Sequence, residues 1–204
     1  MKSFIFDLDG TLIDSYCAIV LSIYESFKKI NLNIDKNTIY KNIIKTSVSQ
    51  YFKSLENDLG INLDFVRKDY LKIENNYLND IKLMPNALKM LEELYKNNSN
   101  LFIFTHRGES RFQILKNNNI DKYFIDTISP YEGVLRKPSG DGINYLCNKY
   151  NLDKKETYYV GDRLIDMESA KDAGVFGILL TNDNNTNIDC FKINDLLDLI
   201  EFIK

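Results

Sequence analysis

The sequence lacks the features that mark membrane, secreted and disulfide-stabilised proteins. No stretch approaches the roughly 20 apolar residues that a membrane-spanning helix needs. The apolar start of the chain is interrupted at Asp7, too early for a signal-peptide core. The three cysteines lie far apart, which indicates neither a disulfide framework nor a paired-cysteine metal site. We therefore expect a cytoplasmic protein with reduced thiols and no membrane association.

An excess of positive charge is also absent. The formal net charge of -3 gives no electrostatic reason to expect nucleic-acid binding, so an anionic ligand would need local positive charge or a metal ion. Tryptophan is missing as well, which we attribute to genome composition rather than to function. The length of 204 residues fits one large domain, or one domain with a smaller insertion.

The most informative segment that is present covers residues 4–11, where an apolar run ends in two acids. Asp7 and Asp9 are two residues apart, so in an extended chain their carboxylates point to the same side. Their repulsion calls for a cation nearby, or for a proton on one of them. A polar turn that ends a buried strand is the simpler interpretation of this segment alone. The rest of the chain must therefore decide whether this segment is a functional site or only a polar turn.

Helical patterns then fill the chain from Ser15 to about Asp80. A first helix is expected to begin after Asp14 or Ser15 and to end near Asn31. Further helices are predicted at about 36–47, 50–59 and 64–78. No strand pattern interrupts them, so residues 15–80 are predicted to form a compact helical unit inserted after the first strand.

Strand and helix patterns alternate in the remainder of the chain. Strands are predicted at 101–105, 123–128, 157–160 and 175–180. Helices are predicted to open at Met84 and to cover 111–118, 141–150, 164–173 and the C-terminal end, and residues 182–187 are expected to form a surface loop. Alternation of this kind predicts an α/β fold, a doubly wound parallel sheet covered on both faces. This α/β core domain is predicted to comprise residues 1–14 and 81–204.

Polar residues follow four of the predicted strands. In such sheets the ligand binds beyond the carboxyl ends of the strands, so these residues are expected to meet at one edge. They are Asp7 and Asp9, Thr105, Lys137, and the pair Asp162 and Asp166. The last two are four residues apart, which places them on one face of a helix.

These motifs together resemble the haloacid dehalogenase-like superfamily of phosphohydrolases. Its pattern is D-x-D-G-T after the first strand, Thr or Ser after the second, a Lys further on, and G-D-x-x-x-D near the end. The corresponding residues here are Asp7-Leu8-Asp9-Gly10-Thr11, Thr105, Lys137 and Gly161-Asp162-Arg163-Leu164-Ile165-Asp166. The resemblance covers the whole chain and implies a Rossmann-like core. It also implies that residues 15–80 are a helical cap, as in the phosphoglycolate phosphatase and beta-phosphoglucomutase branch.

The resemblance implies different roles for the two acids of the first motif. Asp7 would be the nucleophile that forms an aspartyl-phosphate, and Asp9 the general acid and base. A nucleophile must be ionised, whereas an acid needs a proton near the working pH, so the two environments must differ. Repulsion from Asp7 and burial under the cap would favour the protonated form of Asp9.

The resemblance also implies a Mg²⁺ site formed by Asp7, Asp162 and Asp166, with a backbone carbonyl at Asp9. Oxygen ligands of this kind suit a hard cation. The sequence leaves open which of Asp162 and Asp166 binds the metal directly and which acts through water. Asp166 alone has a simpler interpretation, an acid favoured by the dipole of a helix N-terminus.

Thr105 and Lys137 are expected to bind the transferred phosphate. Thr105 would do so through its hydroxyl, and Lys137 as a compact positive charge that neutralises phosphate and nucleophile. The predicted substrate-binding residues are Gly10, Thr11, His106 and Arg107. For His106 and Arg107 a solvated turn or a contact with the cap is the open alternative.

The leading hypothesis is an Mg²⁺-dependent phosphatase that acts on a small phosphorylated metabolite. A phosphomutase of the beta-phosphoglucomutase type and a non-catalytic phosphoryl-binding protein are the alternatives. The presence of Asp9 argues against a dehalogenase and against loss of catalysis. A receiver domain is excluded by the helical insertion and the late G-D-x-x-x-D motif. Neither the substrate nor the oligomeric state follows from the sequence.

Overall fold

The computed structural model describes residues 1–183 and 188–203, and the chain divides into two compact units. One comprises Met1–Asp14 with Lys82–Lys204, and the other comprises Ser15–Ile81. Of the loop expected at 182–187, residues 184–187 lie outside the described part. Among the described residues no helix is long and apolar enough to cross a membrane.

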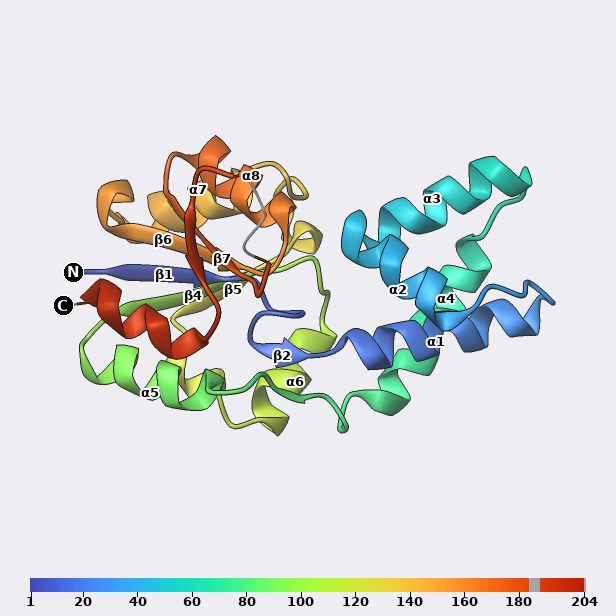
Figure 1. Cartoon of the computed structure of the whole chain (residues 1–204), viewed down its shortest axis with the longest axis horizontal. Helices are drawn as coiled ribbons and strands as arrows, with labels where there is room; N and C mark the ends of the chain where they lie inside the picture. Colours follow the sequence, from blue (N-terminus) through green and yellow to red (C-terminus); the bar gives the residue numbers. More distant parts are fainter. Residues whose placement is uncertain (184–187, 204) are drawn as a thin grey trace. The chain divides into compact units, whose positions relative to one another are not determined.

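The larger unit is built on a six-stranded sheet whose strand order is β5-β4-β1-β6-β7-β8 (Figure 1). The strands are β1 (Ser3–Phe6), β4 (Asn100–Phe104), β5 (Asp126–Ile128), β6 (Thr157–Gly161), β7 (Phe176–Leu180) and β8 (Phe191–Ile193). Every neighbouring pair is parallel, which confirms the predicted fold class. In the centre, Ile5 of β1 is aligned with Phe102 of β4 and Tyr159 of β6. A strand buried on both faces is largely apolar, as β1 is from Phe4 to Phe6.

Helices cover both faces of this sheet. They are α5 (Ala87–Lys96), α6 (Ser110–Asn117), α7 (Asp141–Tyr150), α8 (Leu164–Ala173) and the 3-10 helix η5 (Leu196–Ile203). Helices α5 and η5 lie on one face, and α7 and α8 on the other (Figure 1). Side chains such as Phe104, Ile143 and Leu146 form the core on the second face. Each side chain of this kind stabilises the fold by about 1.5–3 kcal/mol on burial.

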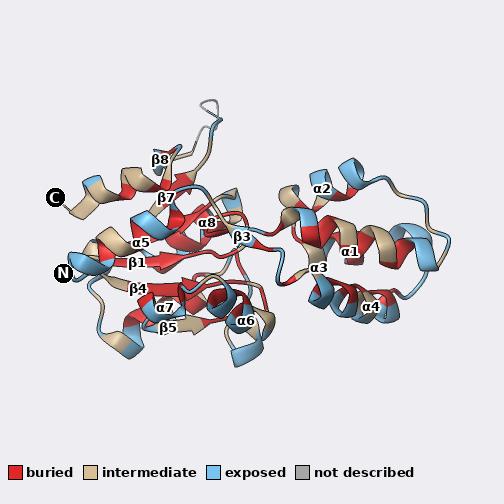
Figure 2. Ribbon diagram, turned by 90° about the horizontal axis from the view of Figure 1, so that it is seen from below, coloured by how far each residue is buried: buried red, intermediate tan, exposed pale blue. Residues whose placement is uncertain are grey.

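The smaller unit is helical and has a core of its own. It contains α1 (Tyr16–Lys29), α2 (Lys36–Lys45), α3 (Val48–Leu59), α4 (Asp64–Glu74) and the short 3-10 helix η1 (Asn75–Tyr77). Buried Ile23, Phe27 and Phe52 lie at its centre, and Figure 2 shows the buried side of these helices in red. Asp35 and Ser47 accept hydrogen bonds from the first turns of α2 and α3, contacts typically worth about 1 kcal/mol each.

Short strands were not foreseen from the sequence. Ile13–Asp14 (β2) pairs antiparallel with Lys82–Leu83 (β3), and the chain enters and leaves the helical unit through this two-stranded ribbon. Strand β8 has only three residues. Two or three residues are too few to show the period that distinguishes a strand, and both ribbon strands depend on partners far away in sequence.

Several predicted boundaries also shift. The strand expected at 123–128 begins only at Asp126, after the 3-10 turn Asp121–Tyr123. The helix expected to open at Met84 begins at Ala87, and the C-terminal helix is of the 3-10 type. For the helices predicted at 141–150 and 164–173, the observed helices begin and end at the predicted residues.

Candidate active site

Asp7 lies directly beyond β1 at the carboxyl edge of the sheet. Its backbone N–H donates to the Val160 carbonyl at 2.8 Å, which extends the pairing of β1 with β6 by one residue. The residue is only 2 % exposed, and its Oδ1 lies 2.8 Å from the Lys137 Nζ. Burial raises the pKa of Asp7 to about 6, against the opposing effect of Lys137 and with the help of Asp166.

Lys137 joins the first and last motifs. Its Nζ lies 2.8 Å from Asp7 Oδ1 and 2.6 Å from Asp166 Oδ1, and its side chain is fully buried. Burial lowers the pKa of Lys137, but the two carboxylates outweigh burial and raise it overall. The amine is therefore a cation held between two acids that come from different strand ends.

Asp166 is fixed from several sides at the start of α8. Its Oδ2 accepts from the Arg163 N–H at 3.1 Å, and its Oδ1 accepts from the Tyr159 hydroxyl at 3.4 Å as well as from Lys137. Gly161 makes this position possible, because a Cβ there would lie 2.4 Å from the Asp166 carboxyl carbon. The glycine of the G-D-x-x-x-D motif is thus needed for space rather than for backbone freedom.

Asp162 completes a group of three carboxylates. The Thr11 hydroxyl donates to its Oδ1 at 3.0 Å, which links the first motif to the last. One oxygen each of Asp7, Asp162 and Asp166 lies within 4.8 Å of the others. The Lys137 ammonium contacts two of these carboxylates, Asp7 and Asp166, and carboxylate oxygens are ligands that Mg²⁺ takes. These residues therefore fit a divalent cation by their donor chemistry.

Asp9 has different surroundings from these three residues. Its carboxylate is held by Arg107, with Nε at 2.9 and 3.1 Å from Oδ1 and Oδ2 and Nη2 at 2.6 Å from Oδ1. The Nη1 of Arg107 also donates to the Ser110 hydroxyl at 3.3 Å. The Arg107 side chain is 5 % exposed, so the ion pair is largely withdrawn from water. Such a paired arrangement favours the ionised form of a carboxylate.

A tight turn around Gly10 follows Asp9 directly. Gly10 has φ of 84°, a left-handed conformation that a residue with a Cβ rarely adopts. Its N–H donates to the Ile13 carbonyl at 2.9 Å, and the Thr11 N–H donates to Leu8 at 3.3 Å. The D-x-D-G-T motif thus ends in a turn closed by backbone hydrogen bonds.

Thr105 directly follows β4 and is completely buried. Its Oγ1 accepts from the Arg107 N–H at 3.1 Å, and its own N–H donates to the Ile128 carbonyl at 3.1 Å. The next residue, His106, accepts from the Lys137 N–H through Nε2 at 2.9 Å. His106 thus contacts Lys137, and Arg107 contacts Asp9 and Thr105, so the two residues bind three predicted catalytic residues.

Sequence reasoning predicted Lys137 beside Asp7 but missed the partner of Asp9 and one partner of Asp166. The Arg107–Asp9 pair joins residues 98 positions apart, and the Tyr159 contact with Asp166 comes from inside a strand. An arginine two residues after the threonine that follows a strand was a usable signal, because the strand ends meet at one edge. Nothing in the pattern of β6 distinguishes Tyr159 from a core aromatic residue.

Comparisons with known proteins agree with this geometry. The family profile of haloacid dehalogenase-like hydrolases matches residues 4–180 and confirms the resemblance inferred from the motifs. Pyrophosphatase PpaX of Oceanobacillus iheyensis is 28% identical over 211 residues, which cover 100% of this chain and 97% of that protein. A phosphoglycolate phosphatase of Vibrio parahaemolyticus is 25% identical over 100% of this chain and 96% of its own. The crystal structure of a hydrolase from Pseudomonas syringae superposes with a TM-score of 0.81 at 26% identity, covering 98% of this chain and 97% of that one.

Proposed function

The chain belongs to the haloacid dehalogenase-like hydrolase family, and we propose that it is an Mg²⁺-dependent phosphatase that uses Asp7 as its nucleophile. The observation that carries the proposal is the position of Asp7, buried at the sheet edge and within 2.8 Å of the Lys137 ammonium. Carboxylates serve as nucleophiles in phosphoryl transfer when nearby positive charge offsets repulsion from the phosphate.

The proposed reaction has two displacements at phosphorus. An Asp7 oxygen forms a bond to phosphorus while the bond to the ester oxygen breaks, and Asp9 donates a proton to that leaving oxygen. Water then attacks the phosphorus of the aspartyl-phosphate and gives its proton to Asp9. Phosphate leaves, the Asp7 carboxylate is regenerated, and Asp9 is again protonated, the form in which it enters the reaction once Arg107 has released it.

Four further residues have roles in this scheme. Lys137 stabilises the negative charge that the phosphate brings beside Asp7, and the Thr105 hydroxyl binds a phosphate oxygen. Asp7, Asp162 and Asp166 would hold Mg²⁺, with the carbonyl of Asp9 as a further ligand. When bound, the ion neutralises the carboxylates and the phosphate that they would otherwise repel.

Arg107 indicates which esters fit best. While Arg107 holds both oxygens of Asp9, that carboxylate is not available to protonate a leaving group. A substrate with a second anionic group can pair with the guanidinium and release Asp9. An ester without a second anion cannot do so, and release of Asp9 would then leave a buried cation without its partner. The relatives named as a pyrophosphatase and a phosphoglycolate phosphatase have substrates of the first kind. We therefore propose a small phosphate ester with a carboxylate or second phosphate, selected by the helical unit Ser15–Ile81 acting as a cap.

A panel of phosphate compounds tests the proposal. The purified chain should release phosphate from some of them with Mg²⁺ and from none with EDTA, and it should prefer compounds with a second anion. The Asp7→Asn variant, prepared in parallel, measures any contaminating phosphatase. Equal release by that variant, or by the wild type in EDTA, would contradict the proposal. Analysis of sugar phosphate products for isomerised sugar separates hydrolysis from mutase activity.

A further inference from the structure

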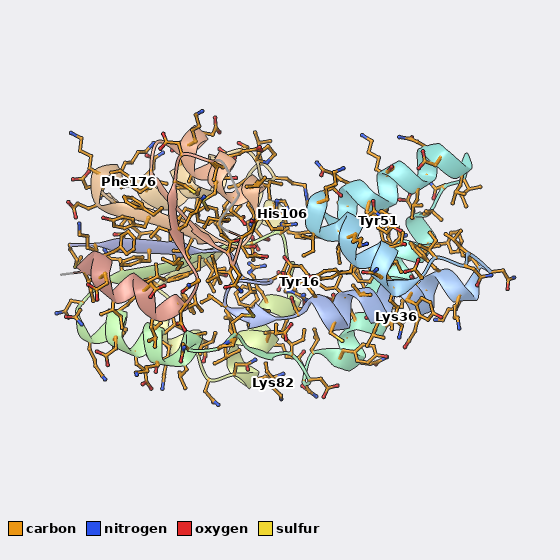
Figure 3. The ribbon with its side chains drawn as sticks, in the orientation of Figure 1. Tyr16, Lys36, Tyr51, Lys82, His106 and Phe176 are labelled. Carbon is orange, nitrogen blue, oxygen red and sulfur yellow. The ribbon has the colours of Figure 1, made fainter. Side chains whose placement is uncertain are left out.

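His106 is the one histidine of the sequence, and the proposed reaction makes no use of it. It follows β4, is partly buried, and is labelled in Figure 3. Its Nε2 accepts a hydrogen bond from the backbone N–H of Lys137 at 2.9 Å, across 31 positions of sequence. The imidazole is therefore bound to the main chain of the residue whose ammonium lies between Asp7 and Asp166.

The segment that carries Lys137 depends on such side-chain contacts. It lies between the 3-10 turn Pro130–Glu132 and α7, outside the strands and helices. Two other backbone N–H groups of this segment also donate to side chains, Leu135 to Asp141 at 2.8 Å and Gly140 to Asp172 at 2.7 Å. Because no sheet ladder fixes the segment, these acceptors decide where its backbone lies.

We propose that His106 is a positioning residue that fixes the backbone of Lys137 and thereby holds the Lys137 ammonium between Asp7 and Asp166. The Lys137 Nζ lies 2.8 Å from Asp7 Oδ1 and 2.6 Å from Asp166 Oδ1, and these short distances leave little freedom for the backbone position of Lys137. A small shift of a catalytic group can lower a rate by about 100-fold. The kinetic part of the inference rests on the proposed phosphatase activity, whereas the hydrogen bond itself can be tested without it.

The role requires a neutral imidazole with its proton on Nδ1, because only an unprotonated Nε2 can accept from an N–H group. Burial lowers the pKa of His106 to about 2, and the positive charges of Lys137, Arg136 and Arg163 act in the same direction. The ring is therefore an acceptor throughout the range in which the enzyme would work. It is neither a general acid nor a general base.

Nitrogen NMR of the untagged protein tests the bond directly, because a single histidine gives one set of ring signals. We expect the Nδ1–H tautomer and no titration between about pH 5 and 8, the range in which an ordinary histidine changes charge. Titration within that range, or a proton on Nε2, would overturn the proposal whether or not the protein hydrolyses phosphate esters.

Two substitutions of His106 test the kinetic consequence. His106→Leu removes the acceptor, and we expect kcat to fall by about 10- to 100-fold with a smaller change in KM, because Lys137 acts mainly in the transition state. His106→Gln offers an amide oxygen to the same N–H and should recover most of the loss. If the Leu variant does not fold, the Gln variant should still fold and remain active, and an inactive, folded Gln variant would contradict the proposal.

Asp172→Ala is the matched control, since it removes an anchor of the same segment at Gly140 rather than at Lys137. Asp172 is exposed, and we expect kcat to change by no more than about twofold, the scale of an ordinary surface substitution. An equal loss in the Asp172→Ala and His106→Leu variants would show a general need for loop order and would overturn the specific role of His106. Absence of activity in the wild type would instead defeat the proposed function and leave the NMR result to decide on the bond.

Discussion

Asp7 and Asp9 are two residues apart at one strand end, yet their surroundings differ. Asp7 is buried beside an ammonium that it shares with Asp166. Asp9 is 19% exposed at its side chain and is held at both oxygens by the guanidinium of Arg107. Lysine brings a compact charge that several acids or a phosphate can share, whereas the planar fork of arginine fits one carboxylate at a time.

The difference indicates how two like charges coexist in a short turn. At Asp7, burial dominates and raises the pKa, so that ionisation depends on nearby positive charge. At Asp9, the paired guanidinium favours the ionised form and restrains the side chain. The two sites can therefore be perturbed separately, and each of the following experiments tests one of them against the other.

The Asp9→Asn variant tests the acid of the pair. We expect kcat to fall by about 10²- to 10⁴-fold for alkyl phosphates, because the leaving alkoxide then receives no proton. The loss of kcat/KM, which reports the first displacement alone, should be much smaller for p-nitrophenyl phosphate, whose leaving group needs no acid. Steady-state kinetics with both esters measures kcat/KM, and an equal loss of kcat/KM for the two would contradict the assignment of Asp9 as general acid.

The Lys137→Met variant tests the ammonium beside Asp7. Removal of the cation leaves two buried carboxylates facing each other, and we expect the free energy of unfolding to fall by about 3–5 kcal/mol. Mg²⁺ should recover part of this loss, because it replaces the missing positive charge. Urea unfolding with and without Mg²⁺ measures both effects.

Lys149→Met is the matched control for this experiment. It removes an ion pair of similar length, 2.8 Å to Asp126, that lies on the surface, where water screens the interaction. We expect little change in stability and no response to Mg²⁺. Equal destabilisation by the two substitutions would contradict the importance of burial at Lys137.

The Arg107→Gln variant tests the partner of Asp9. For phosphoglycolate we expect kcat/KM to fall by about 10- to 100-fold, the cost of a lost hydrogen-bonded charge contact. Ethyl phosphate lacks the second anion and should be affected less, so the preference for phosphoglycolate should shrink. A preference that is unchanged in the variant would show that Arg107 does not select the substrate.

Stability against pH tests the burial of Asp7 and has the smallest expected effect. Burial raises the pKa of Asp7 from 3.8 to about 6, so the folded protein binds this proton more tightly than the unfolded chain does. The resulting stabilisation is complete below the lower value and is lost as pH rises through about 6. In EDTA the urea midpoint should therefore fall between these values, and Asp7→Asn should remove this part of the slope. An identical slope in the variant would place the titration elsewhere.

The sequence was sufficient for the fold and for the residues at the sheet edge. Parallel strands place their carboxyl ends together, so Asp7, Lys137 and Asp166 could be expected to meet before any contact was known. Phe4-Ile5-Phe6 indicated a central strand because only a strand covered on both faces is apolar at every position.

The contacts of Asp9 and His106 could not be predicted in the same way. The Arg107–Asp9 pair joins the turns that follow two different strands, 98 positions apart in sequence. The His106–Lys137 bond depends on the path of an irregular segment. Periodicity describes helices and strands, whereas the directions of side chains in turns depend on conformations that no short pattern specifies.

The most direct test of the account is detection of a phosphoryl group on Asp7. Wild-type protein mixed with a substrate and Mg²⁺, quenched in acid and digested, should yield one phosphorylated peptide, with the phosphoryl group on Asp7. The same peptide from the Asp7→Asn variant should be unmodified, and that variant should release no phosphate. Turnover by the Asp7→Asn variant, or a phosphoryl group on another residue, would contradict the central claim that Asp7 is the nucleophile.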